Sequence, residues 1–237
     1  MNQWPFKMEG NPTCKFHSTY KLNHIRMKKL ERIVASKLLK IKAVKLQPSN
    51  PFTWASGWKS PIYCDNRKTL SYPALRNFIK LELARLIREN YDQADAIAGV
   101  ATGAIAQGAM VAEELGLPFV YVRSSPKDHG LENLIEGDLK PGMKVIVIED
   151  LISTGGSSLK AVEAIRADGS EVIGMLAIFT YGFPVAEEAF KKAKVELTTL
   201  SNYEAVLETA LATNYIHESE LTALQEWRKS PTTWEPK

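Results

Sequence analysis

The stretch VIVIEDLISTGGSS, residues 145–158, decides the fold. Four β-branched apolar residues lead into two carboxylates, and a loop of Ser, Thr and Gly follows before a helical pattern begins. An unbroken apolar run of this kind is typical of a strand that is buried on both faces of a parallel sheet. The loop then lies at the carboxyl end of the strand, where open α/β sheets bind their ligands.

The loop has the groups that bind a phosphate. Backbone N–H groups and hydroxyls of residues 154–157 can point toward one anion, and the N-terminus of the following helix favours its negative charge. Glu149 and Asp150 stand beside the loop and would repel a phosphate, so we expect them to accept hydrogen bonds from ribose hydroxyls. The stretch therefore predicts a ribose-5-phosphate site, with an ordinary strand-to-helix turn as the alternative.

Two other phosphate loops are excluded by their own motifs. A Walker A loop needs a Lys after its last Gly, and no Lys follows Gly156. A dinucleotide-binding loop has spaced glycines with an acid later in the chain, whereas here the acids precede the loop. The order of strand, acidic pair, loop and helix resembles the phosphoribosyl-diphosphate signature of type I phosphoribosyltransferases.

The size and charge of the chain fit one α/β domain. The chain has 237 residues, a formal net charge of +3 and two cysteines, Cys14 and Cys64. This charge gives no reason to expect a nucleic-acid partner, and two cysteines favour a reducing cytoplasm over a disulfide framework. No apolar run approaches the roughly 20 residues of a membrane span, so we expect a cytoplasmic protein without a membrane partner.

The N-terminal region differs from the rest. Residues 1–26 mix Pro, Gly and isolated aromatics without a helical or strand period, which predicts a disordered tail. Residues 26–45 are rich in Lys and Arg but place apolar residues on one helical face, which favours an amphipathic helix over an organelle presequence. Met27 opens this helix and is a candidate translation start. We therefore expect a single domain over residues 27–237.

The remaining chain alternates strands and helices. Besides the central strand we expect strands at residues 96–100, 119–123, 172–181 and 195–200, and a long polar loop after the second of these. Helices are expected at residues 72–90, 185–192, 203–213 and 218–229. A further helix should follow the turn at residues 101–104 and end near residue 115, and another should begin directly after the phosphate loop. Such alternation predicts an α/β fold with a mainly parallel, twisted sheet and helices on both faces.

A second informative stretch is FTWASGWKSPIYCDNR, residues 52–67. Its aromatics and turn residues predict a hairpin-like lid that can stack on a flat ring, although Trp54 and Trp58 can also be core or interface aromatics. The stretch resembles the orotate-binding segment of orotate phosphoribosyltransferases, which implies that the backbone at Tyr63 and Cys64 reads the pyrimidine. Many members of that family have a diphosphate-binding Lys where this chain has Ala55, and Lys59 is a candidate substitute.

A third stretch, YVRSSPKDHGLENLIEG at residues 121–137, combines several charges with turn residues. Such a loop is expected to be mobile and can close over a polyphosphate, with a merely solvated loop as the alternative. It resembles the catalytic loop of the orotate enzymes, which places Arg123, Lys127 and His129 on the diphosphate. The second Lys that is usual beside the Arg is Ser124 here.

A fourth stretch, GVATGAIAQG at residues 99–108, follows a predicted strand. Small residues there let backbone N–H groups converge on an anion, or let a helix pack closely on the strand. In the family this turn binds the diphosphate, often with an unusual peptide geometry, which implies the same role for Thr102 and Gly103.

Together these resemblances cover residues 52–181. They imply the type I phosphoribosyltransferase fold with a small N-terminal hood over the active site, formed by residues of about 27–70 together with C-terminal helices of about 203–229. They also imply a homodimer with shared active sites and Mg²⁺ as cofactor, held by the substrate diphosphate and ribose hydroxyls and by no assigned protein ligand. The implied reaction joins orotate to 5-phosphoribosyl 1-diphosphate in pyrimidine (UMP) biosynthesis.

The resemblance assigns the site residues by role. Lys127, His129, Glu149 and Asp150 take catalytic roles, and Ser153, Tyr63 and Cys64 bind orotate. The residues implied for binding 5-phosphoribosyl 1-diphosphate are Thr102, Gly103, Arg123, Lys127, His129, Glu149, Asp150, Leu151, Ile152, Ser153, Thr154, Gly155, Gly156 and Ser157.

One family feature is absent from the segment FTYGFP, residues 179–184. Some orotate enzymes have an Arg there that meets the orotate carboxylate, so in this chain backbone N–H groups or Ser153 would have to do so. Transfer to another nucleobase remains an alternative, as does a nucleic-acid-binding regulator with the same fold, which the basic helix at residues 26–45 would support.

Overall fold

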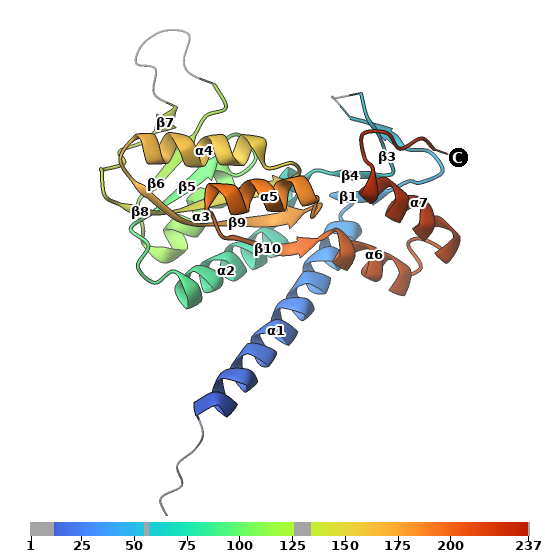
Figure 1. Cartoon of the computed structure of the whole chain (residues 1–237), viewed down its shortest axis with the longest axis horizontal. Helices are drawn as coiled ribbons and strands as arrows, with labels where there is room; N and C mark the ends of the chain where they lie inside the picture. The colour runs from blue at the N-terminus through green and yellow to red at the C-terminus, as the bar shows by residue number, and fades with distance from the viewer. Residues whose placement is uncertain (1–11, 55–56, 126–133, 237) are drawn as a thin grey trace, which may run out of the picture.

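The computed structural model describes residues 12–54, 57–125 and 134–236, with the backbone alone described for residues 12–22. Its centre is a six-stranded sheet in the order β10-β9-β8-β5-β6-β7 (Figure 1). The five parallel strands are β5 (Ala96–Val100), β6 (Phe119–Val122), β8 (Lys144–Ile152), β9 (Glu171–Thr180) and β10 (Leu197–Asn202). The expected mainly parallel α/β sheet is confirmed.

Strand β7 (Ile135–Glu136) is the exception, because it pairs antiparallel with β6 at the sheet edge. It lies inside the segment that we expected to be a long polar loop. A two-residue strand has no period to detect in the sequence, and it forms here because the edge of β6 offers unpaired backbone groups.

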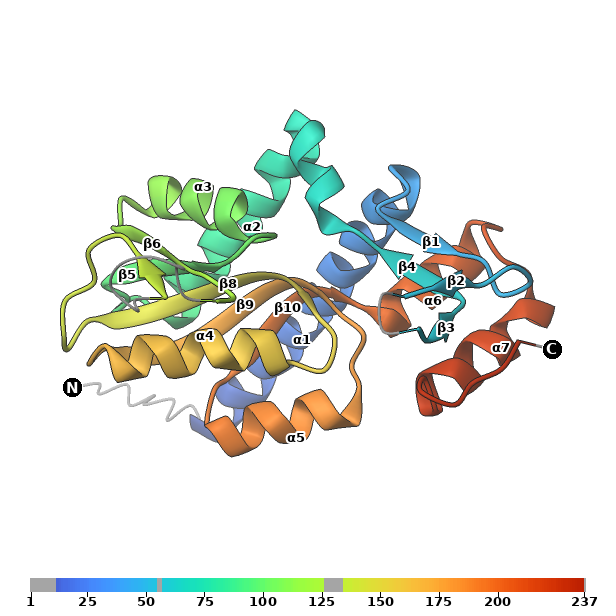
Figure 2. The ribbon, with the colours of Figure 1, turned by 90° about the horizontal axis from the view of Figure 1, so that it is seen from above.

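Helices cover both faces of this sheet (Figure 2). One face carries α2 (Pro73–Asn90) and α3 (Ile105–Leu115), and the other carries α4 (Gly156–Ala167) and α5 (Pro184–Ala193). Each face has its own apolar core. Strand β8 contributes to both, because Val145 and Val147 pack on one side while Ile146 and Ile148 pack on the other. The apolar run in the sequence is therefore buried on both faces, as predicted.

A smaller lobe lies beside the sheet and forms the hood (Figure 1). It contains the antiparallel pair β1 (Val44–Leu46) and β4 (Ile62–Cys64), and the hairpin β2 (Phe52–Thr53) and β3 (Lys59–Ser60). The 3₁₀-helix η1 (Asn66–Ser71) connects β4 to α2, while α6 (Tyr203–Ala212) and α7 (Glu218–Lys229) complete the lobe. Segments far apart in the sequence thus meet in the hood.

Helix α1 (Pro12–Lys40) differs from the prediction at both ends. It begins within the predicted tail, with Pro at its first position, where the missing N–H costs nothing; residues 1–11 lie outside the described part. Leu30, Val34 and Leu38 form the buried face that packs α1 on the domain. Extending a helix that is already packed costs less free energy than nucleating a new one, so the helix can continue into the preceding residues. The helix ends before residue 45, because Lys42 adopts φ 56° and the chain then enters β1.

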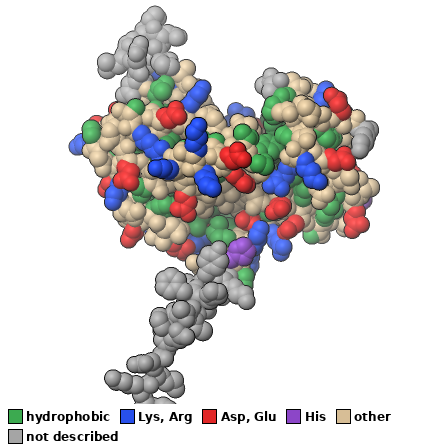
Figure 3. Space-filling view, viewed as in Figure 1, with side chains coloured by type: hydrophobic (Ala, Val, Ile, Leu, Met, Phe, Trp, Pro, Cys, Tyr) green, Lys and Arg blue, Asp and Glu red, His purple; other side chains and the backbone are tan. Residues whose placement is uncertain are grey.

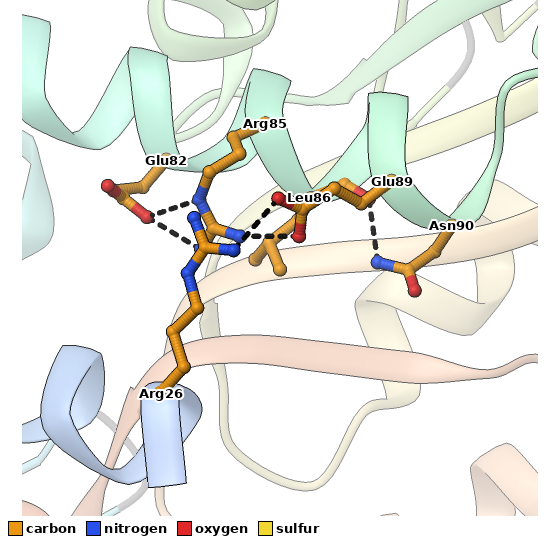
Figure 4. A network of polar contacts seen from close by, with 6 residues as sticks. All are labelled: Arg26, Glu82, Arg85, Leu86, Glu89 and Asn90. Carbon is orange, nitrogen blue, oxygen red and sulfur yellow. Dashed lines mark hydrogen bonds and ion pairs between the residues drawn. The ribbon is translucent and has the colours of Figure 1, made fainter. Parts of the chain in front are cut away.

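The N-terminal part of α1 projects away from the body (Figure 1). Ile25 is 60% exposed there. A polar network ties this part to α2: Arg26 pairs with Glu89 at 3.1 Å, and Arg85 pairs with both Glu82 and Glu89 (Figure 4). No described helix is long and apolar enough to cross a membrane.

Candidate active site

Two loops meet where the strand order reverses. The chain passes from β5 outward to β6, whereas the strand on the other side of β5 is β8. The loops that leave β5 and β8 therefore diverge at one point, which is where open α/β sheets bind ligands. A Cβ atom added to Gly103, after β5, would lie 2.5 Å from the carboxyl carbon of Asp150, at the end of β8. The predicted diphosphate turn and the predicted ribose acid are therefore in contact.

The turn after β5 has an unusual backbone. The peptide bond between Ala101 and Thr102 is cis. The Ala101 N–H donates to the carbonyl of Val122 at 2.8 Å, which fixes the turn to the neighbouring strand. Thr102 is exposed and Gly103 half-buried. Both residues therefore lie at the carboxyl edge of the sheet, where the predicted anion site was placed.

The phosphate loop connects β8 to α4. Gly155 caps α4 with φ 81°, a conformation that favours glycine, and a Cβ at this position would lie 2.8 Å from the Phe190 ring. The N–H groups in the first turn of a helix lack intrahelical partners and are available to an anion. In the described chain no carbonyl or side chain accepts from the N–H groups of Thr154, Gly156 or Ser157. The loop can therefore bind a phosphate through its backbone.

The two acids differ in their surroundings. Glu149 is 5% exposed, and its carboxylate accepts hydrogen bonds from the Ser158 hydroxyl at 2.8 Å and from the Asp150 N–H at 2.9 Å. Burial, together with the neighbouring charge of Asp150, raises the pKa of Glu149 to about 8. Asp150 is half-buried, and burial also raises its pKa, against the charge of Arg67, which lowers it. Asp150 thus has the more accessible carboxylate, while Glu149 lies beneath it.

A cavity of about 300 Å³ lies beside Asp150, between the hood and the end of β8. Its volume is sufficient for a flat ring, and it lies where the surface is hollowed between the two lobes (Figure 3). Its lining is Thr53, Trp54, Tyr63, Cys64, Leu151, Ser153 and Tyr181. All three residues predicted to bind the base thus surround one cavity, next to the predicted ribose site.

The sequence left open whether Trp54 lines a cavity for a flat ring or packs as a core aromatic, and in the structure it does both. Its ring lines the cavity, and it also packs on Trp58, Tyr181 and Trp227 at centroid distances of 5.4 to 6.4 Å. The indole N–H donates to the carbonyl of Ile62 at 3.3 Å, so the ring orientation is fixed. Aromatic packing in the hood therefore builds one wall of the base cavity.

The remaining predicted residues have different positions. Ile152 is fully buried, so only its backbone can reach a ligand. Arg123 pairs with Glu136 on β7 at 3.5 Å. Lys127 and His129 lie outside the described residues, as does Ala55. Lys59 donates to the hydroxyl of Thr53 at 2.8 Å, which places its ammonium group beside the base cavity.

The structure adds residues that the sequence analysis missed. Ser158 binds Glu149, and Asn66 donates to the backbone carbonyl of Asp150 at 2.6 Å. Tyr181, buried under the hood, lines the base cavity. Ser158 follows the phosphate loop directly and was within reach of the motif, whereas the contact of Asn66 joins positions 84 residues apart and has no local signal.

A larger cavity of about 700 Å³ lies elsewhere, between α5, α6 and α7. Gly182, Glu187 and Arg228 contribute to its lining, but no residue predicted for the site does. Because the residues predicted for the site converge on the smaller cavity, it is the candidate active site.

Comparison with known proteins agrees with this geometry. The model of the phosphoribosyl transferase domain matches residues 75–213. The orotate phosphoribosyltransferase of Phocaeicola vulgatus is 76% identical over 209 residues, which are 88% of this chain and 99% of that protein. The chain belongs to the orotate phosphoribosyltransferase family.

Solved structures support the same assignment. The orotate phosphoribosyltransferase of Aeropyrum pernix superposes with a TM-score of 0.68 at 29% identity, covering 78% of this chain and 99% of that one. The UMP synthase of Leishmania donovani gives a TM-score of 0.73 at 26% identity and covers 94% of this chain, which spans 47% of the synthase. The predicted type I phosphoribosyltransferase fold is confirmed, and these relatives favour a transferase over a nucleic-acid-binding regulator.

Proposed function

We propose that this chain transfers the 5-phosphoribosyl group from 5-phosphoribosyl 1-diphosphate to orotate, forming orotidine 5′-phosphate and diphosphate. One observation carries the proposal: the Asp150 carboxylate lies between the phosphate loop, the Gly103 turn and the base cavity. A ribose held at Asp150 would have its 5-phosphate at the loop, its diphosphate at the turn and its anomeric carbon toward the base.

The reaction places positive charge on the ribose ring as the diphosphate leaves, as in glycosyl transfer generally. Asp150 would accept hydrogen bonds from the ribose hydroxyls and stabilise this charge as a carboxylate. Glu149, beneath it, would add to the negative potential when ionised. Its raised pKa follows from burial in the ligand-free chain, and positive charge developing on the ribose would favour the ionised form.

The base cavity holds the ring by stacking and backbone contact. Trp54, Tyr63 and Tyr181 supply aromatic surface, and the backbone of Tyr63 and Cys64 would read the pyrimidine edge. The described lining carries no cation for the orotate carboxylate. Ser153 and backbone N–H groups can donate hydrogen bonds to the carboxylate from within the cavity. Lys59, which donates to the hydroxyl of the lining residue Thr53, can approach the carboxylate from the cavity rim.

Mg²⁺ fits this site as a partner of the substrate. No group of three or more His, Cys, Asp or Glu among the described residues could hold a metal ion. Glu149 is buried and hydrogen-bonded through both carboxylate oxygens, so Asp150, the more accessible carboxylate, would be the one to approach the ion directly or through water. Mg²⁺ usually takes most of its ligands from water and phosphate oxygens. When bound, it would neutralise charge on the leaving diphosphate.

Arg123, Lys127 and His129 would stabilise the diphosphate from a loop that closes over it. We further propose a homodimer in which each Lys127 covers the partner's diphosphate, giving two composite sites related by a two-fold axis. We also infer a cytoplasmic enzyme without a nucleic-acid partner, from the charge and cysteine content of the chain, and without a membrane partner, because no apolar run in the sequence approaches the roughly 20 residues of a membrane span.

The first test is orotate-dependent release of diphosphate, run beside uracil, adenine and xanthine. Release with orotate alone supports the proposal, and release with another base alone refutes it. The dimer is tested by mixing the inactive variants Lys127→Ala and Asp150→Asn under conditions that exchange subunits. With free exchange half of the dimers are mixed and each has one intact site, so about a quarter of wild-type activity should return. No recovery, with exchange confirmed by native mass spectrometry, would place both residues in the same subunit's site.

A further inference from the structure

Asn66 is a buried amide that contacts both halves of the active site. It opens η1 and is 1% exposed. Its Nδ2 donates to the backbone carbonyl of Asp150 at 2.6 Å, and its Oδ1 accepts from the Cys64 thiol at 3.4 Å. One side chain therefore joins the wall of the base cavity to the backbone of the ribose acid.

The Asp150 segment has a strand neighbour on one side only. Strand β8 pairs with β5 as far as Ile148 and with β9 as far as Ile152. Asp150 lies past the last pair with β5, and there the hood approaches β8 through η1. The Asn66 amide is thus a direct polar link between the hood and this half-supported segment.

Asn66 is itself held in place. The Thr69 hydroxyl donates to its backbone carbonyl at 2.6 Å, and Thr69 is also buried. Asp65, one residue earlier, caps η1 by accepting from the Arg67 N–H. A buried amide with both ends hydrogen-bonded has one orientation, because turning it would bring donor against donor and acceptor against acceptor.

We propose that Asn66 is a positioning residue that fixes the base cavity relative to the Asp150 carboxylate. The inference rests on the proposed transfer reaction, in which a base nitrogen attacks the anomeric carbon. Attack requires the two reacting atoms to be held in close contact, and a misplacement of about 1 Å can cost about 100-fold in rate. Asn66 would not touch the substrate, but it would set the distance between the two groups that do.

Two substitutions of Asn66 distinguish the hydrogen bond that its amide donates from the one that it accepts. Asn66→Leu has a similar volume and removes both hydrogen bonds. Asn66→Asp keeps the acceptor for Cys64, but an ionised carboxylate cannot donate to the Asp150 carbonyl. The titratable groups on the elements around this position include Cys64, Asp65, Arg67, Lys68, Glu149, Asp150 and Tyr181. Burial and the neighbouring carboxylates would raise the pKa of the introduced carboxyl, and its protonated form can donate as the amide does.

The test compares kcat, both KM values and melting temperatures of these variants with wild type from about pH 5.5 to about pH 8.5. We expect Asn66→Leu to lower kcat about 30- to 100-fold while each KM stays within about threefold. We expect Asn66→Asp to be similarly slow at high pH and to recover relative to wild type as the pH falls. The matched control is Asn90→Leu, because Asn90 donates to the Leu86 carbonyl at 2.8 Å on α2, away from the site (Figure 4).

Other outcomes overturn the proposal. A lower melting temperature with unchanged kcat would mean that Asn66 only stabilises the hood. Wild-type kcat of Asn66→Asp at high pH, where the introduced carboxylate is ionised and cannot donate, would mean that the donor is not needed. Should Asn66→Leu fail to fold, the pH dependence of Asn66→Asp still decides. Wild-type turnover of orotate is measured first, so failure of the proposed function is distinct from failure of this inference.

Discussion

Gly103→Ala tests whether contact between the Gly103 turn and Asp150 positions the acid that we propose to be catalytic. An added Cβ would lie 2.5 Å from the carboxyl carbon of Asp150 and 2.5 and 2.6 Å from its oxygens. Ordinary contacts of this kind are about 3.5 Å, so the carboxylate or the turn must move by about 1 Å. The Asp150 side chain is short and its backbone carbonyl is bound by Asn66, so the displacement falls on the carboxylate.

The expected effect is on rate more than on stability. A displacement of about 1 Å at a reacting group costs about 100-fold in kcat, which corresponds to about 2.7 kcal/mol in activation free energy. The assay is diphosphate release at saturating concentrations of both substrates, with thermal unfolding measured in parallel. Because Thr102 and Gly103 lie at the carboxyl edge of the sheet, we expect a small change in melting temperature.

Gly174→Ala is a matched control, because its added Cβ would overlap a neighbouring side chain to a similar extent but outside the candidate site. A Cβ there would lie 2.7 Å from the ring of Tyr91, away from the residues placed in the site. Overpacking of this kind costs about 1–3 kcal/mol in unfolding free energy, or about 2–4 °C of melting temperature per kcal/mol for a chain of this size, with kcat unchanged. If Gly103→Ala retained kcat, or if both variants lost kcat and stability together, the positioning argument would be wrong.

Four further outcomes are expected. Asp150→Asn should lower kcat far more than it raises KM for the phosphoribosyl substrate, and a loss confined to KM would mean that the acid only binds. Lys59→Met should raise KM for orotate about tenfold, the loss of one charge-assisted hydrogen bond, with Lys45→Met as control; a rise in KM for the phosphoribosyl substrate alone would place Lys59 on the diphosphate. Deleting residues 1–26 should lower the melting temperature by less than about 4 °C, because the Arg26–Glu89 pair is exposed and such pairs contribute about 0–1 kcal/mol; a larger fall would show that this segment packs on the domain. Because the folded chain keeps the pKa of Glu149 near 8 while the ordinary value is 4.5, the folded state binds the extra proton between these values. Unfolding free energy of the ligand-free chain should therefore fall as pH rises from about 4.5 to about 8, and the same slope in Glu149→Gln would assign it to another group.

Much of the fold follows from local patterns. Strand β5 and helix α7 have the predicted bounds, because each is one uninterrupted pattern between clear breakers. The start of α1 was missed because Pro, Gly and polar residues hid a helix that is extended from a packed segment downstream. Its end was missed because Lys42 leaves the helix with positive φ, a conformation that a Lys side chain does not signal.

In the candidate site, too, local sequence patterns predicted some features, whereas contacts between distant segments were missed. Parallel strands end at one edge of a sheet, so the sequence could predict that the turn after β5 and the acids near the end of β8 would meet. Ser153, Tyr63 and Cys64 were assigned to the base by resemblance, and the structure brings them to one cavity. The partners that orient these groups come from distant segments: Asn66 reaches Asp150 across 84 positions, and Tyr181 comes from the end of β9. No pattern within a single segment carries such contacts.

The segment after β9 shows how a missing residue changes the chemistry of the cavity. No Arg directly follows Tyr181 in the segment of residues 179–184. A guanidinium nevertheless reaches this segment, because Arg228 on α7 donates to the carbonyls of Tyr181 and Gly182. It does not line the base cavity; it lies over the Tyr203 ring and contributes to the larger cavity between α5, α6 and α7. Arg228 therefore stabilises the cavity wall and leaves the described lining without a cation. Since a buried carboxylate without a partner is costly, the groups among the described residues that can discriminate orotate from a neutral pyrimidine are Ser153, the backbone N–H groups of the lining and the cavity rim. This is where Thr53 and Lys59 lie.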